Sequence, residues 1–433
     1  MTSASSRQTT GTDLIELFPE ESRVSDAGTL MIGGCAVDEI ADRFGTPVYV
    51  IDEKGLRRQI RRFIDGLAER WPNSEVVFAS KSFPAVSMYA IAQSEGLSVD
   101  VAGGGELVMA LAAGVAPERI YVHGNAKTDD EVARALAAGV RSLIVDGFDD
   151  LDRLDRLATA HQGVHIRVIP GIDADTHASQ ATGGSESKFG IPLDRLSEAV
   201  SRIENNPHLS LEGIHVHLGS QILNTAQFVT TVEAVAATGV FASYDIGGGL
   251  GVRYNESEAA PSVDDYLDAI TDAAQRVLPP TARLIIEPGR AIVARAGVTL
   301  YTATTVKRTS KTFVAVDGGM GDNVDIALTG QRYEAVVANR MDDPADETCD
   351  VVGRQCESGD LLVGGTPLPR PRVGDLIAMP VTGAYSYTMA NNYNGALIPP
   401  IVFCADGVAR AATRRQTYEE LLELHAPARE ITW

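Results

Sequence analysis

The feature that most constrains the fold is an alternation of short β-rich runs with helical segments between about residues 75 and 290. The intervening segments carry acidic residues near their starts and alanine and leucine at helical spacing, as in 129–138, 192–203 and 264–278. The β-rich runs number eight: 76–80, 97–101, 120–123, 142–146, 165–169, 213–217, 243–246 and 284–287. Eight strand–helix repeats predict an α/β fold with a closed (β/α)8 (TIM) barrel, because open doubly wound sheets usually have fewer units.

Beyond about residue 297 the pattern changes to strands joined by Gly/Pro turns, with little helix before 417–424. Runs at 298–306, 312–316, 376–381 and 400–405 predict a separate all-β domain. The β-like runs 29–32 and 47–51 have no nearby partners, so we expect them to complete its sheet. The predicted organisation is a disordered tail (1–14), an N-terminal segment joining the C-terminal β domain (15–50), the barrel (51–296) and the C-terminal β domain (297–433).

Composition narrows the function classes. The formal net charge is −21 and no basic stripe is present, which argues against a nucleic-acid partner. No apolar run reaches the roughly 18 residues of a membrane span, and the polar start lacks the apolar region of a signal peptide. The four cysteines have no zinc-like spacing, which favours free thiols and a cytoplasmic location.

An ionisable group or a glycine stretch lies at or directly after the C-terminal end of each of the eight runs. Active sites of such barrels lie at the C-terminal ends of the strands. One such residue alone could be a surface or helix-capping residue, but the whole set predicts an active site: Lys81, Asp100, His123, Asp146, Arg167, His217, Gly247–Gly248–Gly249 and Glu287.

Lys81 directly follows the first run, so we expect it at the barrel mouth and partly desolvated. A neutral amine there forms a Schiff base with a carbonyl. The alternative is a structural salt bridge.

Two loops predict a phosphate site. The stretch 245–251 (DIGGGLG) follows the seventh run and 287–290 (EPGR) follows the eighth, where these barrels often bind phosphate through backbone N–H groups. His215 and His217 alternate along one run and are expected on one side, with no further His or Cys at metal-ligand spacing, so no metal is predicted. A Schiff-base lysine, a phosphate cradle and a carboxylate for the ring nitrogen, Glu287, together indicate pyridoxal 5′-phosphate.

Several longer motifs carry a family resemblance. The chain resembles fold-type III pyridoxal-phosphate decarboxylases, most closely the diaminopimelate decarboxylase branch, over about residues 40–425. The motifs are FASKS around Lys81, DVAGGGEL (100–107), HGNAK (123–127), THASQATGGSESKFG (176–190), HVHLGSQ (215–221), DIGGGLG, EPGR, CESGD (356–360) and GAYSY (383–387).

The resemblance implies α-decarboxylation of an amino acid by a barrel-plus-β-domain enzyme that forms head-to-tail homodimers with shared active sites. Lys81 would form the Schiff base, and Cys356 of the other subunit would protonate the carbanion left by CO2. The cofactor would contact Asp100, His217, Ser220, Gly248, Gly249, Glu287, Gly289, Arg290 and Tyr385. Tyr385 and Glu357 would also line the substrate pocket.

One pair of residues departs from the family pattern. Diaminopimelate decarboxylases carry an arginine and a tyrosine, four residues apart, that hold the distal carboxylate of the substrate; here these positions are Asp325 and Thr329. Asp325 could be a solvated acid on an edge strand. If it faces the ligand, either distal contacts come from elsewhere (Arg332 or the 176–189 loop), or Asp325 and Glu357 form an acidic pocket.

An acidic pocket would suit a basic amino acid (L- or D-lysine, ornithine or arginine) or a distally modified one. Two other classes remain. Alanine racemases share the barrel and the cofactor, but Glu287 and CESGD argue against them, and a non-catalytic carrier would not need both Lys81 and Cys356.

Overall fold

The computed structural model describes residues 9–171, 187–423 and 425. They divide into two compact units, whose positions relative to each other are not determined. The barrel unit contains the described residues of 57–252 and 259–293, and the sheet unit contains those of 1–56, 253–258 and 294–433. The segment 253–258 therefore packs with the sheet unit, although the sequence places it inside the barrel.

The barrel unit contains a closed ring of eight parallel strands, as predicted. The ring order is β9, β11, β12, β13, β5, β6, β7 and β8, and β8 pairs again with β9 to close it. A two-residue strand, β10 (Ile191–Pro192), extends β9 outside the ring. The ring strands are β5 (Ser74–Ala79), β6 (Ser98–Val101), β7 (Ile120–Val122), β8 (Ser142–Val145), β9 (Gln162–Ile169), β11 (Leu209–His215), β12 (Ser243–Asp245) and β13 (Arg283–Ile286).

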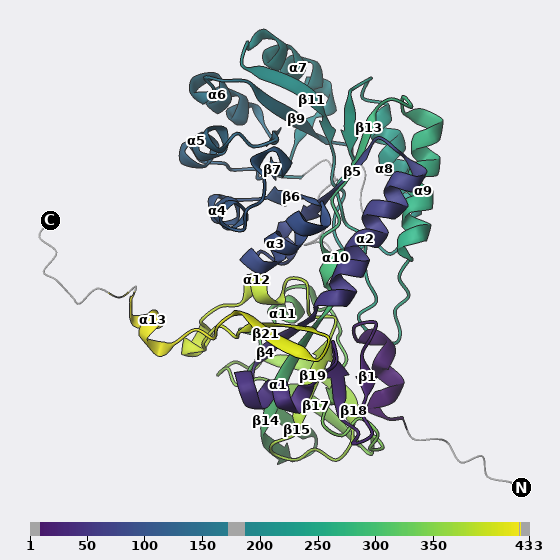
Figure 1. Cartoon of the computed structure of the whole chain (residues 1–433), viewed down its shortest axis with the longest axis vertical. Coiled ribbons are helices and arrows are strands. Elements are labelled where there is room, and N and C mark those ends of the chain that lie inside the picture. Colours follow the sequence, from purple (N-terminus) through teal and green to yellow (C-terminus); the bar gives the residue numbers. More distant parts are fainter. Residues whose placement is uncertain (1–8, 172–186, 424, 426–433) are drawn as a thin grey trace, which may run out of the picture. The chain divides into compact units, whose positions relative to one another are not determined.

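A helix follows every ring strand, and helices such as α5, α6 and α9 lie around the outside of the ring (Figure 1). Two of these helices begin with a capping box, in which a hydroxyl and an acid three residues later satisfy each other's backbone N–H groups: Thr128 with Glu131, and Ser262 with Asp265. The helices are α3 (Val86–Glu95), α4 (Gly104–Ala112), α5 (Asp129–Ala138), α6 (Phe148–Leu157), α7 (Leu196–Asn205), α8 (Ala226–Ala236), α9 (Val263–Val277) and α10 (Arg290–Val293). Helix α2 (Glu53–Arg70) leads from the sheet unit into the barrel.

The sheet unit is built on a largely antiparallel sheet. Its main path runs β18, β17, β15, β14, β4, β20, β21, and β19 joins β14 to β16. The strands are β4 (Val48–Asp52), β14 (Gly297–Arg308), β15 (Thr312–Val316), β16 (Val336–Val337), β17 (Glu347–Val352), β18 (Leu361–Leu368), β19 (Leu376–Pro380), β20 (Ile401–Ala405) and β21 (Val408–Thr413). The β-rich C-terminal domain is therefore confirmed, and the N-terminal strand β4 lies between β14 and β20.

Short elements complete the sheet unit. Strands β1 (Arg23–Val24), β2 (Leu30–Ile32) and β3 (Cys35–Ala36) form a sheet of their own, so the 29–32 run does not join the large sheet. The helices are α1 (Val37–Phe44), α11 (Asp325–Thr329), α12 (Ser386–Met389) and α13 (Tyr418–Glu423). A buried apolar cluster that includes Phe18, Ile40, Val50, Leu300 and Val402 holds these layers together.

Three expectations about local structure are wrong. Residues 11–14, predicted to be disordered, belong to the 3-10 helix η1 (Gly11–Leu17), which Thr10 and Asp13 cap and whose Leu17 is buried. Strand β11 ends at His215, so His217 lies beyond it. Asp325 begins a helix and is buried, which rules out a solvated acid on an edge strand.

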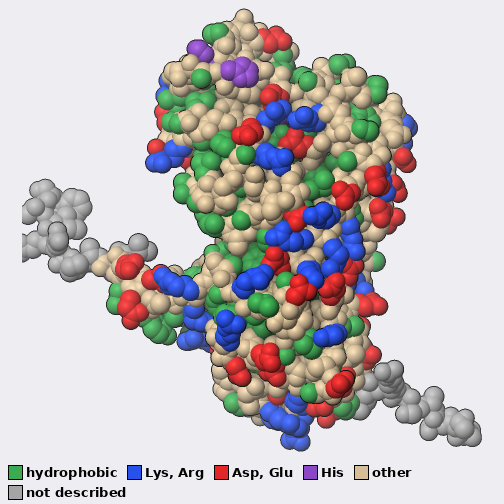
Figure 2. Space-filling model, in the orientation of Figure 1, with side chains coloured by type: hydrophobic (Ala, Val, Ile, Leu, Met, Phe, Trp, Pro, Cys, Tyr) green, Lys and Arg blue, Asp and Glu red, His purple; other side chains and the backbone are tan. Residues whose placement is uncertain are grey.

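The described surface mixes charges of both signs. Figure 2 shows acidic and basic side chains interspersed over the face in view. Within the described residues, no helix has the length and apolar character needed to cross a membrane.

Candidate active site

Glu287 lies at the centre of the polar end of the barrel. It directly follows β13 and is 5% exposed. The Nε2 atom of His215 forms a 3.1 Å hydrogen bond with Glu287 Oε2. His123 Nε2 lies 2.9 Å from Glu287 Oε1, an ion-pair contact that is not aligned as a hydrogen bond. The two imidazoles meet edge to face, 5.0 Å between ring centroids, so each carboxylate oxygen faces one ring nitrogen.

The surroundings shift the pKa values of Glu287 and Asp245 in opposite directions. Burial would raise the pKa of Glu287, but His123 and His215 outweigh it and hold that pKa well below its usual value. Burial and the negative charge of Glu287 raise the pKa of Asp245 well above its usual value. Burial lowers the pKa of His215 to about 4. Near neutral pH, Glu287 is therefore a carboxylate and His215 is a neutral imidazole, while the raised pKa of Asp245 favours its protonated form.

Lys81 lies in the one-turn helix η2 (Ser80–Ser82), directly after β5. Lys81 is exposed and its charge acts on Asp100 and on His217, while Ser80 and Ser82 are buried. Asp100 on β6 fixes this turn, because its Oδ1 accepts the Ser80 N–H at 2.8 Å. Burial raises the pKa of Asp100 to about 7, against the opposing effect of His123.

The glycines after β12 form a loop that side chains could not occupy. A Cβ at Gly248 would lie 2.0 Å from the Glu287 carbonyl oxygen, and one at Gly249 would lie 2.3 Å from the Gly219 oxygen. Gly249 also has a φ of +109°, which side chains rarely adopt. Glycine at both positions lets bare backbone line this end of the barrel.

Hydrogen-bond donors gather beside the glycine loop. Arg290, the first residue of α10, is buried and lies 3.1 Å through Nη2 from Ser220 Oγ. A Cβ at Gly289 would come within 2.8 Å of Ala79, so glycine is needed for α10 to approach β5. His217 Nδ1 accepts the Gly248 N–H at 3.3 Å. The arrangement presents a guanidinium, a hydroxyl and backbone N–H groups together, a donor set suited to phosphate.

The remaining predicted site residues belong to the sheet unit and are described within it. Cys356 is exposed, and its backbone N–H donates to Asn394 Oδ1 at 2.7 Å. Buried Asp360 anchors the loop by accepting the N–H groups of Met320 (2.7 Å) and Gln355 (2.8 Å). The exposed Glu357 accepts a long hydrogen bond, 3.4 Å, from Tyr393. The CESGD loop is therefore fixed to the turn at Gly319 and Met320, while Cys356 stays exposed.

Asp325 is the first residue of α11 and is 3% exposed. Its Oδ2 accepts a hydrogen bond from the Tyr333 hydroxyl at 3.1 Å, and Thr329 Oγ1 donates to the Asp325 carbonyl at 2.8 Å. Tyr385 is half-buried and enters α12 with a φ of +64°. Of the 176–189 loop, residues 176–186 lie outside the described residues.

Comparisons with known proteins agree with this geometry. Residues 56–294 match the family model described as pyridoxal-dependent decarboxylase, pyridoxal binding domain. The chain is 44% identical to a diaminopimelate decarboxylase of Actinosynnema pretiosum subsp. auranticum over 94% of both chains. It is 38% identical to that of Bacillus subtilis (strain 168), over 94% of this chain and 97% of the relative.

Solved structures give the same result. A diaminopimelate decarboxylase from M. jannaschii, in co-complex with L-lysine, superposes with a TM-score of 0.87 at 26% identity, covering 97% of this chain and 99% of that one. The Helicobacter pylori enzyme complexed with L-lysine gives 0.82 at 29% identity, covering 90% and 98%. This chain belongs to the diaminopimelate decarboxylase family. It is a pyridoxal-phosphate-dependent amino-acid decarboxylase, a carboxy-lyase, as the sequence predicted.

The barrel end of this decarboxylase fits pyridoxal phosphate on structural grounds. The loop that a Cβ would block at Gly248 and Gly249 supplies bare backbone, and Arg290 with Ser220 supplies donors for a phosphate. Glu287, held as a carboxylate, suits a protonated ring nitrogen. Spacing alone would also let His123, His215 and Glu287 ligate a metal ion, so the prediction that no other histidine has such spacing is wrong for His123.

Sequence reasoning did not recognise several interior residues of the decarboxylase. His165 is fully buried in the barrel, 2.8 Å from Ser142 Oγ and 2.8 Å from Ser243 Oγ. Asp245 lies within the DIGGGLG motif, yet its link to Glu287 was not foreseen. Their position along the chain could have identified them. His165 and Asp245 alternate along ring strands with residues that face the helices, so their side chains are expected inside the barrel.

Proposed function

We propose that this enzyme removes the α-carboxyl group of an amino acid whose distal end is cationic. Lysine, ornithine and arginine, in L or D form, fit this description, as does a distally modified amino acid with a basic end. One observation carries the proposal. The position at which the family holds a distal carboxylate with arginine is occupied by Asp325, which is 3% exposed and accepts a hydrogen bond from the Tyr333 hydroxyl.

Electrostatics supports a cationic distal group. A carboxylate brought against the buried Asp325 would meet like charge, which is unfavourable where water does not screen it. An ammonium or guanidinium would instead gain a charge-assisted hydrogen bond. Thr329 in place of the family's tyrosine removes a second donor for a distal carboxylate, and Glu357 would add negative charge.

We propose roles in the barrel unit that follow its geometry. Glu287 accepts a hydrogen bond from the ring nitrogen and keeps a proton there, and His217 stacks on the ring. Lys81 attaches the cofactor covalently, and Asp100 holds the turn that carries Lys81. The phosphate is bound by Ser220, Gly248, Gly249, Gly289, Arg290 and Tyr385. When bound, pyridoxal phosphate supplies the electron sink that accepts the electron pair left by departing CO2.

We propose that proton return and substrate binding need a second subunit. Cys356 is the exposed one among the free cysteines of the described chain, and its loop is fixed by Asp360. In a homodimer, Cys356 of the partner subunit donates a proton to the α-carbon after CO2 leaves, and Glu357 and Tyr385 line the distal pocket. We also infer a cytoplasmic location, consistent with four free thiols.

Diaminopimelate is the second candidate substrate. The 44% identity to a protein named diaminopimelate decarboxylase favours it. Its distal carboxylate would then need a cation from the 176–189 loop or from Arg332.

A CO2-release screen across basic amino acids and diaminopimelate, in all stereoisomers, tests the proposal. We expect a basic amino acid to give the highest kcat/KM and Asp325→Arg to move the preference toward diaminopimelate by at least about tenfold. Asp272→Arg, which makes the same charge change at an exposed position on α9, should leave the preference unchanged. Diaminopimelate as the best substrate of the unmodified enzyme would contradict the proposal.

A further inference from the structure

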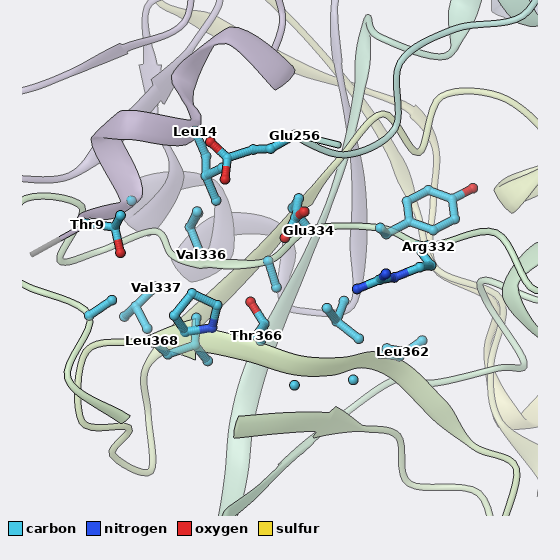
Figure 3. A pocket seen from close by; sticks show the side chains of 18 of the residues that line it. Thr9, Leu14, Glu256, Arg332, Glu334, Val336, Val337, Leu362, Thr366 and Leu368 are labelled. Carbon is cyan, nitrogen blue, oxygen red and sulfur yellow. The ribbon is translucent and has the colours of Figure 1, made fainter. Parts of the chain in front are cut away.

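The sheet unit contains a cavity of about 510 Å³ whose walls belong entirely to that unit. One wall is the segment that follows α11, another is β18, and the N-terminal residues 9–14 and Glu256 close the rim. Figure 3 shows Arg332, Glu334 and Thr366 facing this space from two different elements. The volume is in the range of small-molecule sites.

Five charged residues line the cavity, and three of them, Glu256, Arg332 and Glu334, do not pair with one another. Within the described residues, neither Glu256 nor Arg332 makes an ion pair through its side chain. Glu334 is half-buried, and burial raises its pKa; a hydrogen bond from the Glu256 backbone and the charge of Arg332 oppose that effect, while the carboxylate of Glu256 adds to it. Three acids, Asp13, Glu256 and Glu334, and two arginines, Arg332 and Arg340, line the cavity and leave a net charge of −1.

A buried hydroxyl supplies an independent sign of a ligand. Thr366 on β18 is 3% exposed, and its Oγ1 has no hydrogen-bond partner among the described residues. A buried polar group left unsatisfied costs about 1–3 kcal/mol, so such groups are rare without a partner that binds to them. Figure 3 places Thr366 at the floor of the cavity, below Glu334.

Apolar side chains cover the rest of the wall. They come from β16, β18 and the N-terminal helix: Leu14, Val336, Val337, Leu362 and Leu368. A ligand with a short aliphatic chain between its charged ends would bury that chain here.

From this arrangement we propose that the cavity binds a free basic α-amino acid with an aliphatic side chain, such as lysine, as a second site separate from the catalytic one. The two ammonium groups pair with Glu334 and Glu256, the carboxylate pairs with Arg332, and the Thr366 hydroxyl donates to the carboxylate. The net charges match: lysine carries +1, and the charged residues that line the cavity sum to −1, with Arg340 already paired to Asp343 and Asp375. The site is independent of which substrate the enzyme decarboxylates.

Binding in the cavity would affect the segment 325–333, which contains Asp325 and Tyr333. Tyr333 lies between Arg332 and Glu334 in the chain, and its hydroxyl donates to Asp325. A ligand that fixes Arg332 and Glu334 fixes Tyr333 between them. The cavity is therefore an effector site for a basic amino acid.

The test is calorimetric titration of L-lysine into holoenzyme whose cofactor has been fixed to the protein with borohydride, so that amino acids no longer bond to the cofactor. We expect one lysine per chain at this site. Glu334→Gln and Arg332→Gln should weaken binding by at least about tenfold, and Thr366→Val by about fivefold. Glu39→Gln, at an exposed position on α1, should leave binding unchanged.

Two ligand controls test the charge matching. L-Norleucine lacks the distal amine and cadaverine lacks the carboxylate, so each should bind at least about tenfold more weakly than lysine. Equal binding of norleucine would overturn the assignment to a basic amino acid.

Hydrogen–deuterium exchange on the unmodified chain tests the same site without any variant, so the test does not depend on a variant that folds. Lysine should slow exchange in peptides covering 330–337 and 361–368. No binding at millimolar lysine, or slowed exchange confined to barrel peptides, would overturn the proposal. Thr366→Val adds a further check, because it should raise the melting temperature without lysine while reducing the increase that lysine produces.

Discussion

The two units hold their important acids in different ways. In the barrel, Glu287 follows a ring strand and is contacted by two histidines from two other strands. In the sheet unit, Asp325 begins a five-residue helix and is held by Tyr333 from the segment that follows. A group that several strands of a closed ring position at once cannot change without disturbing the ring. A group on one short helix can be replaced with little effect on the fold.

The difference explains how a family can keep its cofactor chemistry while its substrate changes. The glycines, the Glu287 contacts and the Arg290–Ser220 pair all belong to the barrel. The residues that would meet the distal end of the substrate, Asp325, Thr329 and Glu357, all lie on short helices or loops of the sheet unit. The predictions below test this contrast.

The largest effect is expected at Lys81. Lys81→Ala should lower kcat by at least about 10³-fold, because covalent attachment of the cofactor is lost. The absorbance band of the protein-bound cofactor should disappear. Lys311→Ala, at an exposed position of the sheet unit, is the control and should retain both. Retention of the band in Lys81→Ala would refute the assignment.

Replacing Cys356 should also lower kcat, but it should leave the absorbance band of the protein-bound cofactor in place. Cys356→Ala should lower kcat by about 10²-fold or more as a lost general acid, while Ser358→Ala nearby should not. Mixing Lys81→Ala with Cys356→Ala chains should restore about a quarter of wild-type activity, because half of the random dimers then contain one intact shared site. No restoration would mean that the sites are not shared.

Removing a histidine contact of Glu287 should lower kcat by less than removing Lys81 or Cys356. His215→Asn removes the hydrogen bond to Oε2, so the pKa of Glu287 should rise. We expect kcat to fall about tenfold and the acid limb of its pH profile to move to higher pH. Cofactor affinity, followed by fluorescence, should also fall. An unchanged pH profile would show that His123 alone controls Glu287.

The smallest effect concerns stability in the sheet unit. Burial raises the pKa of Asp322 to about 7, while its Oδ1 accepts the Gly319 N–H at 2.8 Å. A raised carboxyl pKa means that the folded state binds more protons than the unfolded state between about pH 4 and 7, so stability should fall as pH rises through that window. Asp322→Asn should reduce this fall by about 2 kcal/mol, measured by urea unfolding at pH 5 and pH 8.

Much of this architecture could be predicted because it depends on local patterns. Eight β-rich runs alternating with capped helices specify the barrel, and one predicted helix, 129–138, matches α5 residue for residue. The motifs around Lys81, Gly248 and Glu287 indicated the cofactor for the same reason, since each requires a particular residue at a strand end.

Other features could not be predicted because they depend on which strands become neighbours. His123 and Glu287 are far apart in the chain, and only ring closure brings them within 2.9 Å. The turn that carries Lys81 depends on a hydrogen bond from Ser80 to Asp100 on the next strand, and the helix at Asp325 depends on packing that overrides an apolar run typical of a strand.

The sequence alone determined the barrel, the β-rich second domain, the cofactor and the family, because strand–helix periodicity and glycine motifs act over a few residues. Only the tertiary structure decided the protonation of the interior acids, the burial of Asp325 and the cavity at Arg332 and Glu334. Those properties arise from desolvation and from charges brought together across long stretches of chain, and no local pattern encodes either.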